Sequence, residues 1–375
     1  MTVRAFLTDQ IIEATRLYDV SLVVNTTAHR ELSDLLPGVK VIQVPIVRQI
    51  SPAGDLRALF RLIRLCLAER YDLVHSVTPK AGLIAALAGF LSRIPIRLHT
   101  FTGQVWATRV GIARMFLKFM DSLLSACATN VLVDSSSQRD FLLKEGVISA
   151  AKSIVLASGS ISGVDTSRFR PDNVLRAEKR ASLGIGDDGI SLLFVGRLNR
   201  DKGILDLALV FGQLSALEGR LHLVIVGPDE EGLQQRIVDL CGSGQKRVHF
   251  VPFTTEPERF TAAADIFCLP SYREGFGSVV IEAAAAGVPA VGSRIYGITD
   301  AIEEDITGLL FRPGDTEDLK EKILFLVEHP EARNKMGMQA RERAIRHFSK
   351  DKVTAALMEY YAALLEGRAL PTNPS

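Results

Sequence analysis

Short runs rich in β-branched residues alternate with longer helical patterns along almost the whole chain. This alternation is typical of parallel sheets with helices on both faces, because each parallel strand needs a crossover before the next one. Strands are expected at residues 20–25, 39–45, 73–76, 96–99 and 130–134 in the first half, and at 191–195, 221–226, 248–252, 266–269 and 289–291 in the second. The sequence therefore predicts an α/β protein with two doubly wound parallel-sheet domains.

The boundary between the two domains is expected where the apolar periodicity lapses, in residues 163–177. The 375 residues are enough for two hydrophobic cores of ordinary domain size. We therefore expect an N-terminal domain over residues 1–165 and a C-terminal domain over residues 166–350. Residues 351–375 are expected to form a helix that packs back on the first domain, followed by a frayed tail.

The beginning of the chain departs from this pattern. Residues 2–17 are expected to form a helix, whereas a doubly wound sheet normally opens with a strand. The first domain thus lacks its first strand in this sequence. We expect either a truncated chain or a start codon further upstream.

The overall charge is nearly balanced, with 44 Lys and Arg residues against 43 Asp and Glu residues. This balance argues against both a nucleic-acid-binding protein and an acidic disordered one. Between Lys40 and Met120, however, twelve basic residues accompany only three acidic ones.

The four cysteines lack metal-ligand spacing, which indicates reduced thiols in a cytoplasmic protein. No apolar stretch is long enough to cross a bilayer, and the N-terminus has no signal-peptide pattern.

The turn after the strand at 191–195 carries three cations within six positions, Arg197, Arg200 and Lys202. Ligands of open parallel sheets bind at the carboxyl ends of strands, where helix N-termini attract anions. Arg197 can fork onto a phosphate and Lys202 can supply a point charge. A solvated turn explains this segment equally well. The segment is not a Walker loop, because the G-x-x-x-x-G-K-[ST] pattern is absent.

A second turn, after the strand at 266–269, combines two carboxylates with glycines. Glu274 stands in the loop, Gly275 and Gly277 allow close backbone approach, and Glu282 lies about two turns into the following helix. The two carboxylates can hold hydroxyls of one extended, sugar-bearing ligand, while backbone N–H groups of residues 277–280 receive its phosphates. The alternative is that one of these carboxylates caps the following helix and the other lies on a solvated helix face. It is weakened because Glu282 sits in an otherwise apolar helix.

These two turns resemble the donor site of glycosyltransferase family 4. The family consists of retaining enzymes with two Rossmann-like domains facing each other across a cleft, the architecture called GT-B. The resemblance covers most of the chain from about Thr8 onward and is specific to the superfamily, not to a substrate. Its motifs are Arg197 with Lys202, Glu274-Gly-Phe-Gly with Glu282, the following Ala-Ala-Gly-Val-Pro, the hinge-like segment 159–165 with Phe169 and Pro171, Val226-Gly227, and 307–310.

The resemblance implies a role for each matching residue. Arg197 and Lys202 would neutralise the donor diphosphate, and Glu282 would bind the ribose hydroxyls. Glu274 would contact the transferred sugar, so Glu274, Arg197 and Lys202 are the expected catalytic residues. No metal or other cofactor is expected, since side chains and a helix dipole meet the leaving-group charge and no D-x-D is present. The expected donor-binding set is Arg197, Lys202, Glu274, Gly275, Phe276, Gly277, Ser278, Val279 and Glu282.

One motif of the family is altered in the first domain. The family commonly carries His-Thr-x-His-Gly after a strand, and its second His reaches the donor sugar. This chain has His99-Thr-Phe-Thr102-Gly103, so Thr102 replaces that His and the usual sugar contact is in doubt. His99, Thr102 and Gly103 are candidates for the acceptor side, although a hydrogen-bonded strand histidine is the favoured interpretation of His99.

The basic first half also contains two helical patterns that combine cations with apolar residues. Arg57, Arg61 and Arg64 fall on one helical stripe, and Arg114 with Lys118 repeat the pattern. Such helices can lie on an anionic bilayer surface. The alternative is a buried apolar face with a merely solvated basic stripe. Nucleic acid fits poorly, because aromatic residues are not interleaved with the charges.

A further segment bears on the acceptor. Residues 76–82 resemble a pattern in lipopolysaccharide and capsule enzymes, whose acceptor is often a sugar on a polyprenyl diphosphate. Lys80 is therefore the candidate for contacting the lipid diphosphate.

These expectations combine into one prediction. The protein is predicted to be a retaining glycosyltransferase that moves a hexosyl or N-acetylhexosaminyl group from a nucleotide sugar, with UDP as the expected nucleotide, to a polyprenyl-diphosphate-linked saccharide. It would work in surface polysaccharide or lipopolysaccharide assembly, as a peripheral protein at the cytoplasmic face of the membrane. The alternatives are a sugar-nucleotide epimerase or phosphorylase of the same architecture, or an inactive subunit that only binds a nucleotide sugar.

Overall fold

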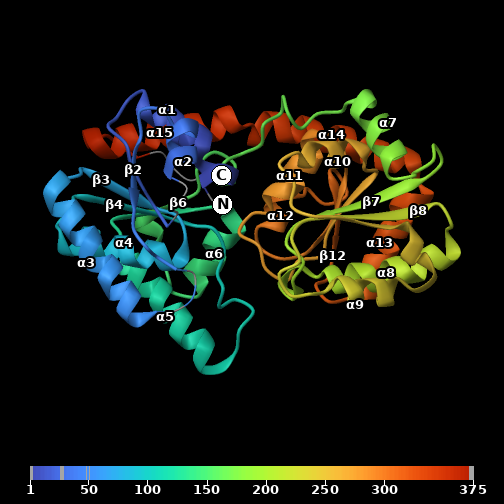
Figure 1. The fold of residues 1–375 in the computed structure, drawn as a ribbon, viewed down its shortest axis with the longest axis horizontal. Coiled ribbons are helices and arrows are strands. Elements are labelled where there is room, and N and C mark those ends of the chain that lie inside the picture. The colour runs from blue at the N-terminus through green and yellow to red at the C-terminus, as the bar shows by residue number, and fades with distance from the viewer. Residues whose placement is uncertain (1–2, 26–28, 48, 50, 371–375) are drawn as a thin grey trace. The chain divides into compact units, whose positions relative to one another are not determined.

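The computed structural model describes residues 3–25, 29–47, 49 and 51–370, which form two compact units. The first unit contains the described residues up to Ser162 together with those from Lys350 onward, and the second is Gly163–Ser349. The last helix of the chain, α15 (Lys350–Glu366), therefore belongs to the first unit (Figure 1). Within the described residues, no helix is both long and apolar enough to span a bilayer.

The second unit is built on a six-stranded, wholly parallel sheet with the order β12-β11-β10-β7-β8-β9. The chain starts in the middle of the sheet at β7, builds outward through β8 and β9, and then returns to β10 on the other side of β7. The direction of winding therefore switches between β7 and β10. The strands are β7 (Ile190–Val195), β8 (Leu221–Val226), β9 (Val248–Val251), β10 (Ile266–Leu269), β11 (Ala290–Ser293) and β12 (Gly308–Phe311).

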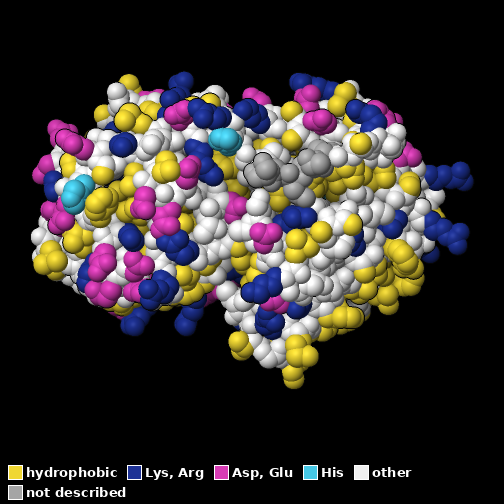
Figure 2. All heavy atoms as spheres, turned by 180° about the vertical axis from the view of Figure 1, so that it is seen from behind, with side chains coloured by type: hydrophobic (Ala, Val, Ile, Leu, Met, Phe, Trp, Pro, Cys, Tyr) yellow, Lys and Arg dark blue, Asp and Glu magenta, His cyan; other side chains and the backbone are white. Residues whose placement is uncertain are grey.

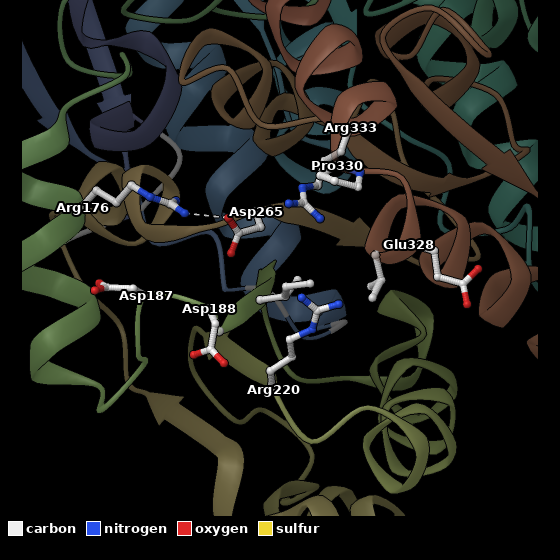
Figure 3. Close-up of a pocket in the computed structure, with 11 residues that line it drawn as sticks. Arg176, Asp187, Asp188, Arg220, Asp265, Glu328, Pro330 and Arg333 are labelled. Carbon is white, nitrogen blue, oxygen red and sulfur yellow. Dashed lines mark hydrogen bonds and ion pairs between the residues drawn. The ribbon is translucent and has the colours of Figure 1, made fainter.

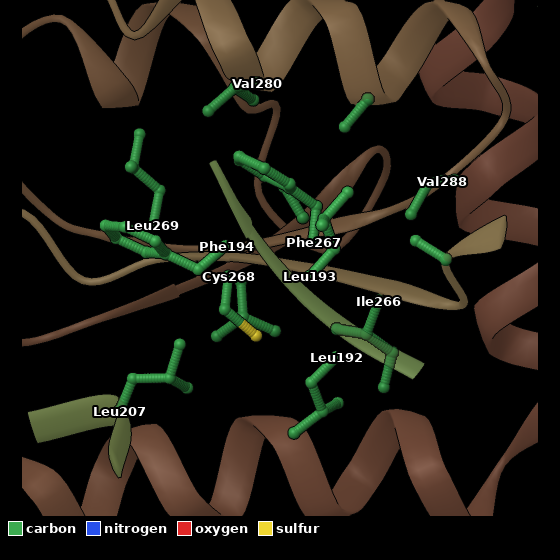
Figure 4. Close-up of a cluster of buried hydrophobic side chains, with 14 of the residues drawn as sticks. Leu192, Leu193, Phe194, Leu207, Ile266, Phe267, Cys268, Leu269, Val280 and Val288 are labelled. Atoms are coloured by element: carbon green, nitrogen blue, oxygen red, sulfur yellow. The ribbon is translucent and has the colours of Figure 1, made fainter. Parts of the chain in front are cut away.

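Helices cover both faces of this sheet, so its central strands are apolar throughout. Figure 1 shows α8, α9 and α13 on one face and α10, α11 and α14 on the other. Leu192, Leu193 and Phe194 of β7 are completely buried and pack with the side chains of β10 (Figure 4). The helical segments are α7 (Asn173–Ser182), η3 (Arg200–Lys202), α8 (Ile204–Leu217), α9 (Gln234–Cys241), η4 (Gly242–Arg247), α10 (Pro257–Ala263), α11 (Ser278–Ala285), α12 (Ile298–Ala301), α13 (Thr316–Glu328) and α14 (Pro330–Phe348).

The first unit contains parallel strands where the sequence predicts them, but they form two sheets. One sheet pairs β1 with β2, and the other has the order β3-β4-β5-β6. Among the described residues no strand joins β1 to β3, so this half departs from a single doubly wound sheet. The strands are β1 (Ser21–Val24), β2 (Lys40–Gln43), β3 (Leu73–Ser76), β4 (Ile96–Phe101), β5 (Asn130–Val133) and β6 (Ser153–Ile154).

The beginning of the chain is helical, as the sequence predicts, with a π-helical turn η1 (Val3–Leu7) leading into α1 (Thr8–Thr15). Residue Thr2 of the predicted helix and the tail 371–375 lie outside the described residues. Helices α1 and α15 pack against one face of the larger sheet, where Leu98, Leu132 and Tyr360 share a core. The remaining helical segments are α2 (His29–Leu35), α3 (Pro52–Glu69), α4 (Pro79–Leu91), α5 (Gly111–Cys127), α6 (Ser136–Lys144) and η2 (Ala150–Lys152).

Candidate active site

The two turns singled out in the sequence follow β7 and β10, which are neighbouring strands of one parallel sheet. Their carboxyl ends therefore meet at the same edge, at the point where the winding of the sheet switches direction. Open parallel sheets bind ligands outside the carboxyl ends of their strands at such a switch point. Residues more than seventy positions apart in the sequence are thus brought together by the sheet topology alone.

The central contact of the site is an ion pair between the two loops. The Nζ of Lys202, at the end of η3, lies 2.5 Å from Oε1 of Glu274. The same carboxylate oxygen accepts a hydrogen bond from the hydroxyl of Ser271 at 2.8 Å. Both charged side chains are mostly shielded from solvent, at 19% and 12% exposure. Because ion pairs of low exposure are weakly screened, this contact joins the predicted cation and the predicted carboxylate into one unit.

Backbone contacts fix the two loops against each other. Gly203 has a φ of +65°, and a Cβ at this position would lie 1.9 Å from the carbonyl oxygen of Pro270. The N–H of Tyr272 donates to the carbonyl of Asp201 at 2.8 Å, and Arg273 forms an ion pair with the Asp201 carboxylate at 3.0 Å. Only glycine permits this close approach, so the position of Lys202 relative to Glu274 is set by the backbone.

The loop after Glu274 ends at the N-terminus of α11. Gly277 is its N-cap residue, has a φ of +82°, and offers no side chain to cap the helix. The first N–H groups of an α-helix lack partners inside the helix, and together with the helix dipole they favour an anion at this end. The predicted ligand residues Ser278 and Val279 stand in this first turn. A Cβ on Gly297 would lie 2.4 Å from the carbonyl oxygen of Gly275, so the backbone is also closely packed on its far side.

Glu282 lies on the second turn of α11 in surroundings that disfavour its charge. Desolvation raises the pKa of this carboxyl to about 7, nearby Arg168 opposes the shift, and Glu258 adds to it. Arg168 is itself engaged, since it forms an ion pair with Glu258. A desolvated carboxylate in an apolar helix needs donors, and hydroxyl groups of a ligand would supply them.

Arg197 is not free in this structure. Its guanidinium forms a two-oxygen contact with Glu230 at 2.9 and 3.1 Å, and Asn199 also donates to Glu230 at 3.3 Å. Glu230 follows β8, the other neighbour of β7, and was missed in the sequence. The sequence signal that identifies Glu230 as a site residue is its position after the predicted strand at residues 221–226, which becomes β8.

The structure places the side chain of Phe276 away from the expected ligand contacts of its backbone. It is almost completely buried, at 2% exposure, and its ring contacts Phe348 of α14 at a centroid distance of 5.2 Å. The ring is therefore part of the hydrophobic core. Only the backbone of Phe276 remains available to a ligand.

The candidate acceptor-side residues all lie in the first unit, and two of them are already engaged. Lys80, on the first turn of α4, forms an ion pair with Asp55 at 2.7 Å and donates to the Val47 carbonyl at 2.9 Å. His99 is buried in β4, its Nδ1 lies 2.9 Å from the Ser76 hydroxyl, and desolvation lowers its pKa to about 3. His99 thus matches the favoured interpretation of a hydrogen-bonded strand histidine.

Thr102 and Gly103 follow β4 directly and are half-buried. The structure thus places them at the carboxyl end of a parallel strand. Gly103 has a φ of +133°, a conformation that favours glycine.

The two basic stripes differ in the structure. Arg114 and Lys118 of α5 both form ion pairs with Glu145, at 2.8 and 2.6 Å, and both lie over the ring of Trp106. Glu145, at the end of α6, therefore offsets one of the two positive charges of this pair. On α3, in contrast, the stripe of Arg57, Arg61 and Arg64 is exposed. Arg48 lies outside the described residues.

Comparison with solved structures defines the class of the fold. The Anabaena protein HepE, solved in complex with UDP, superimposes with a TM-score of 0.76, 21% identity and coverage of 95% of each chain. The lipopolysaccharide-biosynthesis glycosyltransferase WaaG superimposes with a TM-score of 0.70 at 17% identity and covers 96% and 95% of the two chains. The chain thus has the GT-B glycosyltransferase fold.

Sequence comparison then identifies the family. The model for glycosyl transferases group 1 matches residues 176–343, and a glycosyl transferase 4-like domain matches residues 10–159. The capsular polysaccharide biosynthesis glycosyltransferase CapM of Staphylococcus aureus is 30% identical over 324 residues, which is 86% of this chain and 85% of that protein. The chain therefore belongs to the group 1 glycosyltransferases, as the motifs predicted, and is a glycosyltransferase.

One further relative has a name that specifies its reaction. The Escherichia coli UDP-Gal:alpha-D-GlcNAc-diphosphoundecaprenol alpha-1,3-galactosyltransferase is 25% identical over 357 residues, covering 92% of this chain and 89% of that protein.

Proposed function

We propose that this chain is a retaining glycosyltransferase that transfers a sugar from a UDP-linked donor to a polyprenyl-diphosphate-linked saccharide in surface polysaccharide assembly. The observation that carries the proposal is the Lys202–Glu274 ion pair at the switch point of the second sheet, beside the uncapped N-terminus of α11. This arrangement suits a ligand with a phosphate group next to a polyhydroxylated ring.

The donor diphosphate would lie at the N-terminus of α11, within reach of Lys202 and Arg197. On binding, Lys202 would exchange its contact with Glu274 for a phosphate oxygen, and Arg197 would exchange part of its contact with Glu230. The cations and the helix N-terminus would stabilise the charge that develops on the departing nucleoside diphosphate. For this reason we propose that the reaction needs no metal ion.

The two carboxylates of the site would bind the two sugars of the donor. Glu282 would accept hydrogen bonds from the ribose hydroxyls, which favours its ionised form. Glu274, released from Lys202 but still bonded to Ser271, would accept hydrogen bonds from the transferred sugar. The backbone of residues 275–277 would line the same sugar.

Retention of configuration would follow from attack on the same face as the departing phosphate. In that geometry the phosphate oxygen takes the proton of the acceptor hydroxyl, so a protein nucleophile is not required. In this proposal Glu274 keeps its hydrogen bond from Ser271 when Lys202 moves to the phosphate, and it acts as a hydrogen-bond acceptor and not as a nucleophile.

The lipid-linked acceptor is proposed from the printed reaction of the E. coli relative, which acts on a diphosphoundecaprenol-linked sugar. Lys80, the expected contact of the lipid diphosphate, would have to leave Asp55 to make it. The exposed stripe of Arg57, Arg61 and Arg64 on α3 offers cations without that cost. We therefore assign the stripe on α3, ahead of Lys80, to the anionic membrane surface and the lipid diphosphate.

A membrane-facing surface is further supported by an apolar stripe on α5. Ile112, Met115, Phe116 and Phe119 are spaced by three and four residues, and are 84%, 69%, 51% and 59% exposed. Figure 2 shows hydrophobic side chains gathered at the projecting end of this helix. An exposed apolar helix face, together with exposed cations on another helix of the same unit, suits the headgroup region of a bilayer, and we propose peripheral attachment at the cytoplasmic face.

The deciding experiment measures release of nucleoside diphosphate from a panel of UDP-, GDP- and dTDP-sugars, with and without a polyprenyl-diphosphate sugar. Release that depends on the acceptor and occurs with a UDP-sugar is expected. Conversion of the donor without acceptor would instead indicate an epimerase. Binding of UDP without any release would favour a silent binding subunit, for which Thr102 in place of the family's His is the specific observation.

A further inference from the structure

A polar cavity lies in the second unit, at the opposite end of the sheet from the donor loops. It has a volume of about 440 Å³ and is lined where β7, β8 and β10 begin, at Ile190, Arg220 and Asp265 (Figure 3). Because all strands are parallel, the residues that begin them stand a full strand length from the residues that end them. This cavity is therefore separate from the site formed by Lys202 and Glu274.

Three arginines from three different segments line the cavity. Arg176 comes from α7, Arg220 precedes β8, and Arg333 lies on the second turn of α14. Figure 3 shows the guanidinium groups of Arg220 and Arg333 directed toward each other across the opening. Desolvation lowers the pKa of Arg333, Asp265 opposes this shift, and the like charges of Arg176 and Arg220 add to it.

The carboxylate at the base of the cavity is already neutralised. Asp265 forms ion pairs with Arg176 at 2.6 Å and with Arg180 at 3.0 Å, and it also accepts a hydrogen bond from the N–H of Ser191 at 2.8 Å. Two guanidinium groups therefore share one carboxylate. Asp265 therefore offsets Arg333 only from beyond ion-pair distance, while it pairs directly with the two other guanidinium groups.

Arg333 is the cation with the weakest compensation. It is half-buried, and its Nη1 donates to the carbonyl oxygen of Leu326 at 2.9 Å. In the described part of the chain, no carboxylate lies within ion-pair distance of its guanidinium. Placing a guanidinium away from water without an anion is costly, so the cavity is suited to receive one.

The remaining acidic residues of the cavity stand at its rim. Asp187, Asp188 and Glu328 are all exposed. In Figure 3 the carboxylates of Asp187 and Glu328 point away from the space between Arg220 and Arg333. The lining thus holds three arginines and four carboxylates, and its positive charge is confined to the space between Arg220 and Arg333, since the exposed carboxylates are screened by water and salt.

We propose that this cavity is a binding site for the phosphoryl group of a small metabolite, held by the guanidinium groups of Arg333 and Arg220 with Arg176 at its edge. Guanidinium groups bind tetrahedral oxyanions through pairs of parallel N–H donors, which a compact ammonium cannot do. The volume leaves room for a body larger than phosphate alone.

The test uses inorganic phosphate as the probe and follows thermal unfolding of the full chain as phosphate replaces chloride at constant ionic strength. A ligand that binds only the folded state raises Tm by mass action. The variants are Arg333→Gln and Arg220→Gln. The matched control is Arg341→Gln, an exposed arginine on the same helix as Arg333 and outside the cavity. Phosphate bound at the donor loops contributes equally to all four proteins and cancels in the comparison.

Wild type and Arg341→Gln are expected to show the same phosphate-dependent rise in Tm. Arg333→Gln and Arg220→Gln are each expected to need at least tenfold more phosphate for an equal rise. Because Arg220 is exposed and its ion pair is with the nearby Glu218, its variant keeps the test valid even if Arg333→Gln lowers stability. Equal phosphate dependence in all four proteins would overturn the proposal.

Discussion

The Nζ of Lys202 and the Oε1 of Glu274 lie 2.5 Å apart, although they stand on loops that follow two different strands. The cation assigned to the donor diphosphate and the carboxylate assigned to the transferred sugar thus form an ion pair with each other in this structure. This pairing keeps each side chain in place without a ligand. It also means that the donor has to displace one ionic contact to form another.

Replacing Lys202 with Ala is expected to lower turnover about 100-fold to 1,000-fold, since a group that stabilises developing charge in a shielded site contributes roughly 3–4 kcal/mol. The measurement is nucleoside diphosphate release at saturating acceptor, with thermal unfolding as a check of the fold. Lys335→Ala, an exposed lysine on α14, is the matched control and should retain full turnover. Undiminished release by Lys202→Ala would remove this residue from the reaction.

The pH dependence of nucleotide binding should report on Glu282. Its pKa is raised to about 7 by desolvation, so the free site is largely protonated below that pH. If ribose hydroxyls bind the carboxylate, affinity for UDP should increase up to about pH 7 and then level off, and binding at pH 6 should release a proton. Glu282→Gln should flatten this profile in calorimetric titrations from pH 5.5 to 8. A pH profile unchanged by Glu282→Gln would contradict the ribose assignment, and Glu331→Gln is the exposed control.

The same residue should also affect stability. The pKa of Glu282 in the folded chain lies above its ordinary value of 4.5, so the protonated carboxyl stabilises the fold fully below pH 4.5, and this contribution is lost as the pH rises through 7. Glu282→Gln, which stays neutral, should therefore be more stable than wild type at pH 8, and the gain in Tm should shrink toward pH 5. A gain in Tm that increases as the pH falls would contradict this explanation.

The contact between the two donor loops predicts a strong effect of Gly203→Ala. Its Cβ would meet the carbonyl oxygen of Pro270 at 1.9 Å, in addition to the strain of a positive φ. Gly232→Ala is a matched control, because Gly232 has a φ of +68° and open space around its Cβ position. We expect a loss of about 1 kcal/mol in unfolding free energy for Gly232→Ala from strain alone, and a clearly larger loss for Gly203→Ala. Equal losses in denaturant titrations would show that the loops separate easily.

The apolar stripe of α5 predicts membrane binding that depends on particular side chains. Phe116→Ser with Phe119→Ser should lower partitioning onto anionic liposomes more than tenfold, since each exposed Phe that enters the lipid contributes at least about 1.5 kcal/mol. Thermal stability should hardly change, because both rings are exposed in the folded chain. Phe253→Ser, an exposed phenylalanine of the second unit, is the control.

Salt separates the two contributions to this binding. The cations of α3 should make the pulldown weaker at high salt and on neutral liposomes, whereas the apolar contribution of α5 should persist. Equal recovery on neutral and anionic liposomes at low salt would remove the electrostatic part of the proposal.

Much of the fold could be predicted because the relevant signals are local. The strands of the second unit lie close to the predicted residues, since buried parallel strands are continuous apolar runs such as Leu192–Phe194 within β7. The short strands β6 and β12 were not predicted as strands. β6 has only two residues, too few for a periodic pattern to emerge, and β12 begins with a glycine, a residue that is depleted in strands.

The sequence by itself determined the α/β class, the two loops of the donor site and the family, because turn glycines, helix starts and apolar runs act over a few residues. Only the tertiary structure decided which charges are free. It pairs Arg197 with Glu230, Lys80 with Asp55 and Lys118 with Glu145, and it leaves the apolar stripe of α5 exposed. It also gathers Arg176, Arg220 and Arg333 at one cavity. The physical reason is that an ion pair or a buried helix face depends on the packing of distant segments, which local sequence patterns do not specify.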